Sequence, residues 1–216
     1  MAEKLKYSTG IKTKPFLFVE LKKMAKYKRE NEKLSNKKLK DKAIKDNVLQ
    51  FDTEKRNKEV ASVCIKRLDE LDDFLLDKLL NGAMDVSKQI AIYSILKTDR
   101  LFFEFMNEVY RDKFQIGEPF ITDRDFNIFF NYKAEQSDKV AGWSDYTYYK
   151  LKQVIVRILF EANLIKDQEE REIKRPILPQ VIVEHLEDKG DKKYVQAMLG
   201  GWVNAINKRE AGQNTS

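Results

Sequence analysis

The sequence of 216 residues contains few cysteines, histidines, prolines and glycines. With Cys64 as its one cysteine and His185 as its one histidine, the chain has no ligands for an internal disulfide or for a zinc site of cysteines and histidines. A serine–histidine or cysteine–histidine catalytic pair would have to use His185, which lies in VIVEHLED without a nucleophile at a suggestive spacing. We therefore expect no catalytic residue, no metal and no cofactor.

Long hydrophobic runs are also missing. No stretch approaches the ~20 uncharged apolar residues of a membrane-spanning helix, and the densest run, VIVRILF, is interrupted by Arg157. The first residues are charged and lack the apolar centre of a secretion signal. These absences favour a cytoplasmic protein with no membrane partner. Four prolines and eight glycines are too few for the frequent turns of an all-β fold, and favour long helices.

Charge is abundant and unevenly placed. Charged residues make up 35% of the chain, above the roughly 25% of an average globular protein. Residues 1–58 hold 18 Lys or Arg against 8 Asp or Glu, whereas the remainder holds 23 against 27. A basic N-terminal quarter is typical of proteins that bind a polyanion. It is equally typical of a lysine-rich solubilising surface, and charge alone does not separate the two.

Apolar residues recur at helical spacing along most of the chain, so the sequence predicts an all-α fold, a compact multi-helix bundle. Two N-terminal helices are predicted at 15–28 and 36–48, with Val19 among the inward residues of the first. Polar residues that suit helix N-caps mark the start of later helices: Thr53, Asp85, Thr122 and Ser144. The helix after Thr53 either continues or breaks near Asp69. The segment QIGEPF predicts a domain boundary, with an N-terminal domain at 1–115 and a C-terminal domain at 116–216.

The segment 144–165, SDYTYYKLKQVIVRILFEANLI, carries two stripes on one helix. The apolar stripe, which includes Leu151, Ile155 and Ile158, is expected to be buried. The opposite stripe consists of Tyr146, Lys150, Gln153 and Arg157, whose hydroxyl, ammonium, amide and guanidinium groups suit phosphate oxygens and base edges. An ordinary solvated helix face is the alternative.

The residues after this helix are typical of a winged helix-turn-helix unit. Asn163 tolerates the left-handed conformation that ends a helix, and Leu164 and Ile165 are expected to return to the core. The charged segment 166–178 then forms either a wing of two short strands or a loop. The helix at 122–136 would be the packing partner.

A second group of candidate DNA-binding residues lies in the N-terminal part. Lys55, Arg56 and Lys58 occupy the first turns of the helix that begins after Thr53, where basic charge opposes the helix dipole. Phosphates approaching this end would explain the arrangement, and Glu54 offsets part of the unfavourable charge. We therefore expect a basic helix-turn-helix-like unit in this part as well.

Several of these segments together resemble the BrxA family of the bacteriophage exclusion (BREX) defence systems. They are YSTGIKTKPFLFVELKKMA, DNVLQFDTEKRNKEVASVCIKRL, DRLFFEFMNEVYRDKF, ITDRDFNIFF and, most specifically, YYKLKQVIVRILFEANLI. The similarity covers roughly residues 7 to 199. Asn163 stands where the family pattern often has Gly, and both residues can adopt the conformation of this turn.

The resemblance implies an all-helical fold with two helix-turn-helix-like units beside positive surface, and a role in binding double-stranded DNA. It also implies partners among the other BREX proteins, which include a DNA methyltransferase, an ATPase and a phosphatase-like protein. The resulting hypothesis is a non-enzymatic DNA-binding protein, with RNA binding as a variant. The alternative is a helical adaptor that docks other defence proteins on the acidic segment 69–81 and the aromatic helix 101–110.

Overall fold

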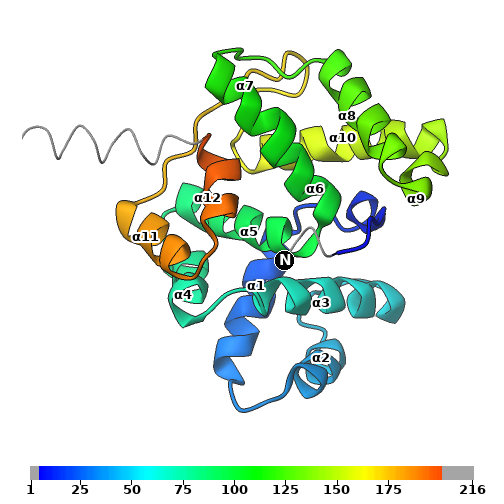
Figure 1. Ribbon diagram of the computed structural model, residues 1–216. Helices are drawn as coiled ribbons and strands as arrows, with labels where there is room; N and C mark the ends of the chain where they lie inside the picture. The colour runs from blue at the N-terminus through cyan, green and yellow to red at the C-terminus, as the bar shows by residue number, and fades with distance from the viewer. Residues whose placement is uncertain (1–4, 201–216) are drawn as a thin grey trace, which may run out of the picture.

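Residues 5–200 are described by a computed structural model, and within this range the regular secondary structure is helical (Figure 1). Two isolated β-bridges are its only extended pairings, so the prediction of an all-α fold is confirmed over the described residues. None of the helices in this range is long and apolar enough to cross a membrane.

The N-terminal half packs its helices around α3. Its elements are the 3-10 helix η2 (Gly10–Lys12), α1 (Phe18–Glu30), α2 (Asn36–Lys45), α3 (Glu54–Leu68), α4 (Asp73–Asn81) and α5 (Met84–Thr98). Helix α3 contacts α1, α2 and α5, while α4 contacts α1 and α5. Thr53 caps α3 as predicted, because its hydroxyl accepts the backbone N–H of Arg56 at 3.3 Å. The break near Asp69 is present, and Asp72 caps the new helix α4.

A long continuous rod comes next, made of α6 (Arg100–Phe105), η3 (Met106–Tyr110) and α7 (Arg111–Ile116). The middle segment η3 is a stretch of π-helix, which the sequence pattern did not predict. The aromatic side chains of Phe102, Phe105 and Tyr110 are fully buried. They are therefore core residues, and these aromatic side chains are not available for docking another protein.

The C-terminal part contains α8 (Asp123–Glu135), α9 (Asp138–Ala141), α10 (Asp145–Glu161), α11 (Gln180–Asp188) and α12 (Lys192–Leu199). Thr122 and Asp125 form a capping box at the start of α8. Helix α12, the red-orange helix labelled in Figure 1, crosses back to pack on α5, η3 and α7. The buried apolar residues of both halves belong to one cluster. The division into domains 1–115 and 116–216 stays a prediction.

A buried carboxylate ties the N-terminal segment to this core. Glu104 accepts hydrogen bonds from Tyr7 and Arg100, each at 2.7 Å, and lies 3.0 Å from the ammonium group of Lys133. Burial alone would raise the pKa of Glu104, but these partners outweigh it and lower that pKa. The charged cluster therefore fixes the chain near Tyr7 against α6 and α8.

Four local predictions were wrong in detail. Helix α1 begins at Phe18 rather than at 15, because Leu17 adopts a left-handed conformation with φ 51°. Val19 is 61% exposed, since it points away from the stripe that packs on α3. Helix α2 ends at Lys45 rather than at 48, close to Asn47 with φ 45°. Asp85 lies in the first turn of α5, and Ala83 is the N-cap residue.

Candidate nucleic-acid interface

Helix α10 forms as its sequence pattern predicts. The Ser144 hydroxyl accepts the backbone N–H of Thr147 at 3.3 Å and so caps the first turn. The apolar stripe is buried against the rest of the protein at Leu151, Val154, Ile155, Ile158, Leu159 and Ala162. The stripe fixes the rotation of α10 about its axis, and therefore which side chains face solvent.

The four predicted residues of α10 lie on its exposed side, and the structure adds Tyr149 to them. Tyr146 is 66% exposed and Tyr149 50% exposed. The ammonium group of Lys150 lies 5.5 Å from the centre of each of these rings and donates to Gln153 Oε1 at 3.0 Å. Gln153 Nε2 donates to the Tyr149 hydroxyl at 2.7 Å. Tyr149 precedes Gln153 by four residues, so helical spacing alone could have identified it.

Arg157 lies further along the same stripe and differs from Lys150 in its surroundings. Its guanidinium is 3.6 Å from the carboxylate of Glu161, so part of its charge is neutralised within the helix. Lys150 contacts an amide and two aromatic rings, and forms no ion pair in the part of the chain that the structure describes. Positive charge on this face is therefore concentrated near the N-terminal half of α10.

The turn after α10 has the predicted form. Asn163 adopts φ 63°, and Leu164 and Ile165 return to the core with almost no exposure. The side chain of Asn163 is held on both sides, because its amide donates to Asp85 at 3.1 Å and its carbonyl accepts from Lys174 at 2.9 Å. The left-handed turn is thus fixed both by backbone conformation and by side-chain contacts.

Residues 164–174 fold back as a small antiparallel hairpin. Lys166 N–H donates to Glu172 O and Lys174 N–H to Leu164 O, both at 2.8 Å. The segment before α8 adds a third extended stretch, since Ile173 N–H donates to Pro119 O and Ile121 N–H to Arg171 O. We call residues 164–174 the hairpin. The sequence left open whether this segment forms a wing of two strands or a loop. The structure is intermediate, because the pairing of the hairpin is limited to isolated bridges.

The hairpin lies beside the exposed face of α10. Arg171 pairs with Asp123 at 2.6 Å, and Asp123 also pairs with Lys152 of α10 at 3.0 Å. The bonds from Lys152 and Arg171 lower the pKa of Asp123, so it remains ionised. A surface hollow of about 350 Å³ separates the two elements and includes Tyr149 and Gln153 of α10 in its lining.

The N-terminal segment 5–17, which we call the strap, lies on another side of α10. Lys12 Nζ donates to Thr147 Oγ1 of α10 at 3.4 Å. Next to it, Thr13 O accepts a hydrogen bond from Arg56 of α3 at 3.1 Å. The strap therefore connects the N-terminal ends of α3 and α10, two helices that the sequence places far apart.

The three predicted residues of α3 are not equivalent. Arg56 is partly buried by its bond to the strap and by the Phe51 ring, 5.5 Å from its guanidinium carbon. Lys55 and Lys58 are exposed, and Lys58 borders a hollow that it shares with Asp41 and Lys45 of α2. The structure thus assigns Arg56 a structural contact. Helix α2 also carries exposed lysines that were not among the predicted residues: Lys37, Lys38, Lys42 and Lys45.

The remaining reactive side chains are held in structural contacts. Cys64 is fully buried, and burial raises the pKa of its thiol to about 12. His185 Nε2 lies 2.8 Å from Asp72, which also receives a bond from Lys189 at 2.7 Å. Burial opposes ionisation of Asp72, but bonds from Lys189, the Leu75 N–H and His185 outweigh it and hold its pKa at about 2.

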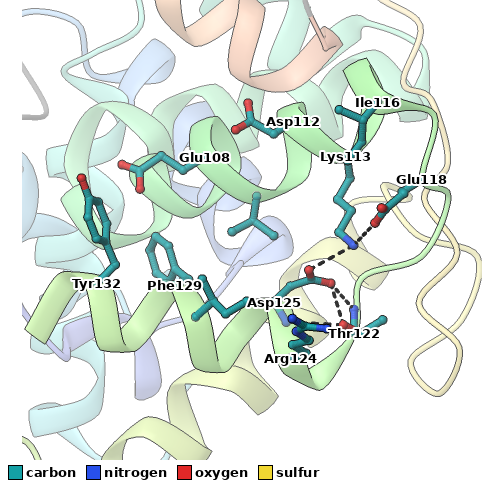
Figure 2. Close-up of a pocket in the computed structure, with 12 residues that line it drawn as sticks. Glu108, Asp112, Lys113, Ile116, Glu118, Thr122, Arg124, Asp125, Phe129 and Tyr132 are labelled. Carbon is teal, nitrogen blue, oxygen red and sulfur yellow. Dashed lines mark hydrogen bonds and ion pairs between the residues drawn. The ribbon is translucent and has the colours of Figure 1, made fainter.

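A groove of about 600 Å³ lies between the η3–α7 rod and α8 (Figure 2). Its charged side chains are mostly paired, with Lys113 bridging Glu118 and Asp125. Ile116 and Ile128 are exposed beside these charges. A groove with apolar side chains and neutralised charges suits contact with another protein better than contact with a phosphate backbone.

Comparison with known proteins identifies relatives over most of the chain. The BrxA family model matches residues 5–190. A BREX protein BrxA from Bacillus cereus (strain H3081.97) is 50% identical over 201 residues, covering 93% of this chain and 100% of that protein. A BREX protein BrxA from Paramagnetospirillum magneticum (strain ATCC 700264 / AMB-1) is 22% identical over 152 residues, covering 70% and 76% respectively. The crystal structure of an uncharacterized protein from Magnetospirillum magneticum shares the fold, with a TM-score of 0.77, 20% identity and coverage of 91% and 100%.

Proposed function

Because this chain belongs to the BrxA family, we propose that it is a cytoplasmic, non-enzymatic component of a BREX phage-defence system that binds double-stranded DNA. The observation that carries the proposal is the exposed face of α10. It presents Tyr146, Tyr149, Lys150 and Gln153 together, with the hairpin on one side and the strap on another. An exposed helix face that carries amide, hydroxyl and ammonium donors suits the major groove of B-form DNA.

We further propose that residues 120–174 form a winged helix-turn-helix unit, in which α10 is the recognition helix. The order of elements supports this assignment: an extended stretch, α8, the short α9, α10 and then the hairpin. The first extended stretch pairs with the returning arm of the hairpin, so the three stretches lie together. In this arrangement α8 supports α10, with the Phe130 ring 5.3 Å from that of Tyr148.

The free protein already orders the side chains that would meet DNA. Lys150, Tyr149 and Gln153 hold one another through hydrogen bonds and cation–π contacts. Lys150 retains further N–H groups for phosphate, and Gln153 retains its second amide N–H for a base edge. Because part of the rotamer freedom is already lost before binding, the entropic cost of contact with DNA is reduced.

Exposed lysines of the N-terminal part supply additional phosphate contacts in this proposal. Lys55 and Lys58 of α3 are exposed, Lys58 borders the same hollow as Lys45 of α2, and the strap connects the start of α3 with the start of α10. Such contacts add affinity without sequence preference, because every duplex carries the same phosphate backbone.

The test is a fluorescence-anisotropy titration of the whole chain with a short duplex at several salt concentrations. Replacing Lys150, Gln153 and Arg157 together by alanine should weaken binding at least about tenfold at about 0.1 M salt, since two phosphate contacts are removed. The matched control replaces Lys26, Gln115 and Lys192, which are exposed side chains of the same charges on other elements. Equal affinities of the two triple variants would exclude α10 from the interface. Competition with duplex RNA distinguishes the RNA-binding variant.

A second candidate function is an adaptor for other BREX proteins, and the groove between the η3–α7 rod and α8 favours it. Ile116 and Ile128 are 66% and 57% exposed there, an unusual situation for large aliphatic side chains at a concave surface. Replacing Ile128 by aspartate should abolish co-purification with another BREX protein and leave the affinity for the DNA duplex unchanged. If co-purification survives the replacement, the groove is not the docking surface.

A further inference from the structure

The strap is anchored firmly at both ends. At its start, Tyr7 is buried and donates to Glu104, while the Arg100 guanidinium carbon lies 4.1 Å from the Tyr7 ring centre. At its end, the buried Arg67 donates to the carbonyl groups of Lys14, Pro15 and Phe16 at 2.7–3.0 Å. The residues between these anchors are therefore presented at a defined place beside α10.

The side chains between the two anchors are mostly small, so the surface of the strap beside α10 stays accessible. Ser8, Gly10 and Thr13 are small and exposed, and Ile11 is buried beneath them. Lys12 is the residue that reaches across to α10, where Thr147 Oγ1 accepts its hydrogen bond. The ammonium group thus contacts a neutral hydroxyl, which does not neutralise its charge.

Lys12 differs from the nearby lysines Lys14 and Lys152 in that it forms no ion pair within the described part of the chain. On the strap, Lys14 pairs with Glu59 at 3.2 Å, and on α10, Lys152 pairs with Asp123 at 3.0 Å. Lys12 and Lys150 form no ion pair with any residue in the range 5–200. Thr147 and Lys150 are three residues apart on α10, so their Cβ atoms lie about 5–6 Å from each other on one face. Two lysines from different parts of the chain, neither of them in an ion pair among the described residues, therefore both contact residues in the first half of α10.

We infer that Lys12 of the strap and Lys150 of α10 together form a binding site for the phosphate backbone of DNA, and that the strap is a DNA-binding arm. This inference rests on the proposed function, since it assumes that α10 enters a groove of the duplex. The backbone strand that borders that groove would then pass over Thr147 and between the two ammonium groups. Tethering of Lys12 in the free protein lowers the entropy that this side chain loses on binding.

The experiment measures affinity of the whole chain for a fluorescein-labelled duplex at several salt concentrations. Lys12→Gln removes one charge and keeps the length of the side chain close to that of lysine. One phosphate contact contributes about 0.9 to the slope of log K against log salt, so its loss lowers affinity about eightfold at 0.1 M salt and reduces the slope by about 0.9. Lys150→Gln should have a similar effect, and the double variant should lose about 1.8 from the slope.

Matched variants separate a specific contact from a general change of charge. Lys192→Gln makes the same change of charge at an exposed lysine of α12 and should leave affinity nearly unaltered. Lys12→Arg keeps the charge and should bind as well as the unaltered chain. Thr147→Val keeps both ammonium groups but removes the tether, and should weaken binding less than Lys12→Gln does. Thermal unfolding followed by circular dichroism verifies that each variant is folded.

The outcomes distinguish the inference from the proposed function. If Lys12→Gln binds like Lys192→Gln while Lys150→Gln binds more weakly, the strap is not a DNA-binding arm and the assignment of α10 stands. If the unaltered chain binds no duplex at the lowest salt concentration, the proposed function itself is wrong. A slope reduced by Lys12→Gln and restored by Lys12→Arg supports the inference.

Discussion

Replacing Arg67 by alanine tests whether one buried guanidinium holds the strap in place. Arg67 is 4% exposed on α3, and its donors reach Phe16 O at 2.8 Å, Lys14 O at 3.0 Å and Pro15 O at 2.7 Å. Burial lowers its pKa to about 10, so the side chain remains charged at neutral pH. A single side chain therefore satisfies three consecutive carbonyl groups of a segment without regular secondary structure.

The loss of stability in Arg67→Ala depends on how well each of the three carbonyl groups can replace the guanidinium as its hydrogen-bond partner. The bond to Phe16 is buried, and an unsatisfied buried acceptor costs about 1–3 kcal/mol. The bonds to Lys14 and Pro15 are partly buried, so water can replace the guanidinium there, and we assign each about 1 kcal/mol. The expected loss in the free energy of unfolding is therefore about 3–5 kcal/mol, a large fraction of the stability of a typical domain.

The assay is urea unfolding at pH 7, followed by circular dichroism, with Arg56→Ala as the control. Arg56 makes one exposed bond to the same segment, at Thr13 O, so its removal should cost less than about 1 kcal/mol. If Arg67→Ala is no more destabilising than Arg56→Ala, the guanidinium does not hold the strap and the reasoning is refuted. If the strap is released, Arg67→Ala should also abolish the contribution of Lys12 to DNA affinity.

Three further predictions concern single residues. Asp72→Asn should be less stable than the unaltered chain above about pH 5, and the difference should vanish as the pH falls towards 2. The reason is that the pKa of Asp72 is about 2 in the folded chain and about 3.9 in an unfolded one. Urea titrations across this pH range test the prediction, and a stability difference independent of pH would contradict it. Asn163→Val should cost at least about 1–2 kcal/mol because of the left-handed backbone, whereas Asn163→Gly should cost less, as compared by urea unfolding. Thr122→Ala should cost about 1 kcal/mol through loss of the α8 cap, and an unchanged urea midpoint would argue against the capping box.

The sequence predicts well those features that are decided within a few residues. Thr53, Thr122 and Ser144 cap their helices because each hydroxyl meets an N–H group three residues ahead. The stripe on α10 is determined by helical periodicity alone. Val19 was misplaced for the same local reason, since it lies across the helix from Leu21 and does not share its face.

Contacts between distant segments lie beyond such reasoning. Arg56, one of the predicted DNA-binding residues, also donates to Thr13 O, and no periodicity indicates this partner 43 residues away. The bond between Lys12 and Thr147 joins residues 135 positions apart. The strap itself has no helical pattern to identify it, and its path depends on the buried Arg67. The part of the candidate site that the sequence could not predict is the part made by tertiary packing.

Ion pairing explains where the excess positive charge of this chain resides. The acidic segment 69–81, an alternative docking surface for other proteins, is largely occupied by the chain itself: Asp69 pairs with Lys28, and Asp77 with Arg29. These pairs are exposed and contribute little stability individually. They nevertheless neutralise the basic end of α1, and leave unpaired charge on α2, the strap and the start of α10. Among residues 5–200, the lysines that form no ion pair therefore include those of α2, Lys12 of the strap and Lys150 of α10, whereas Asp69 and Asp77 are already paired.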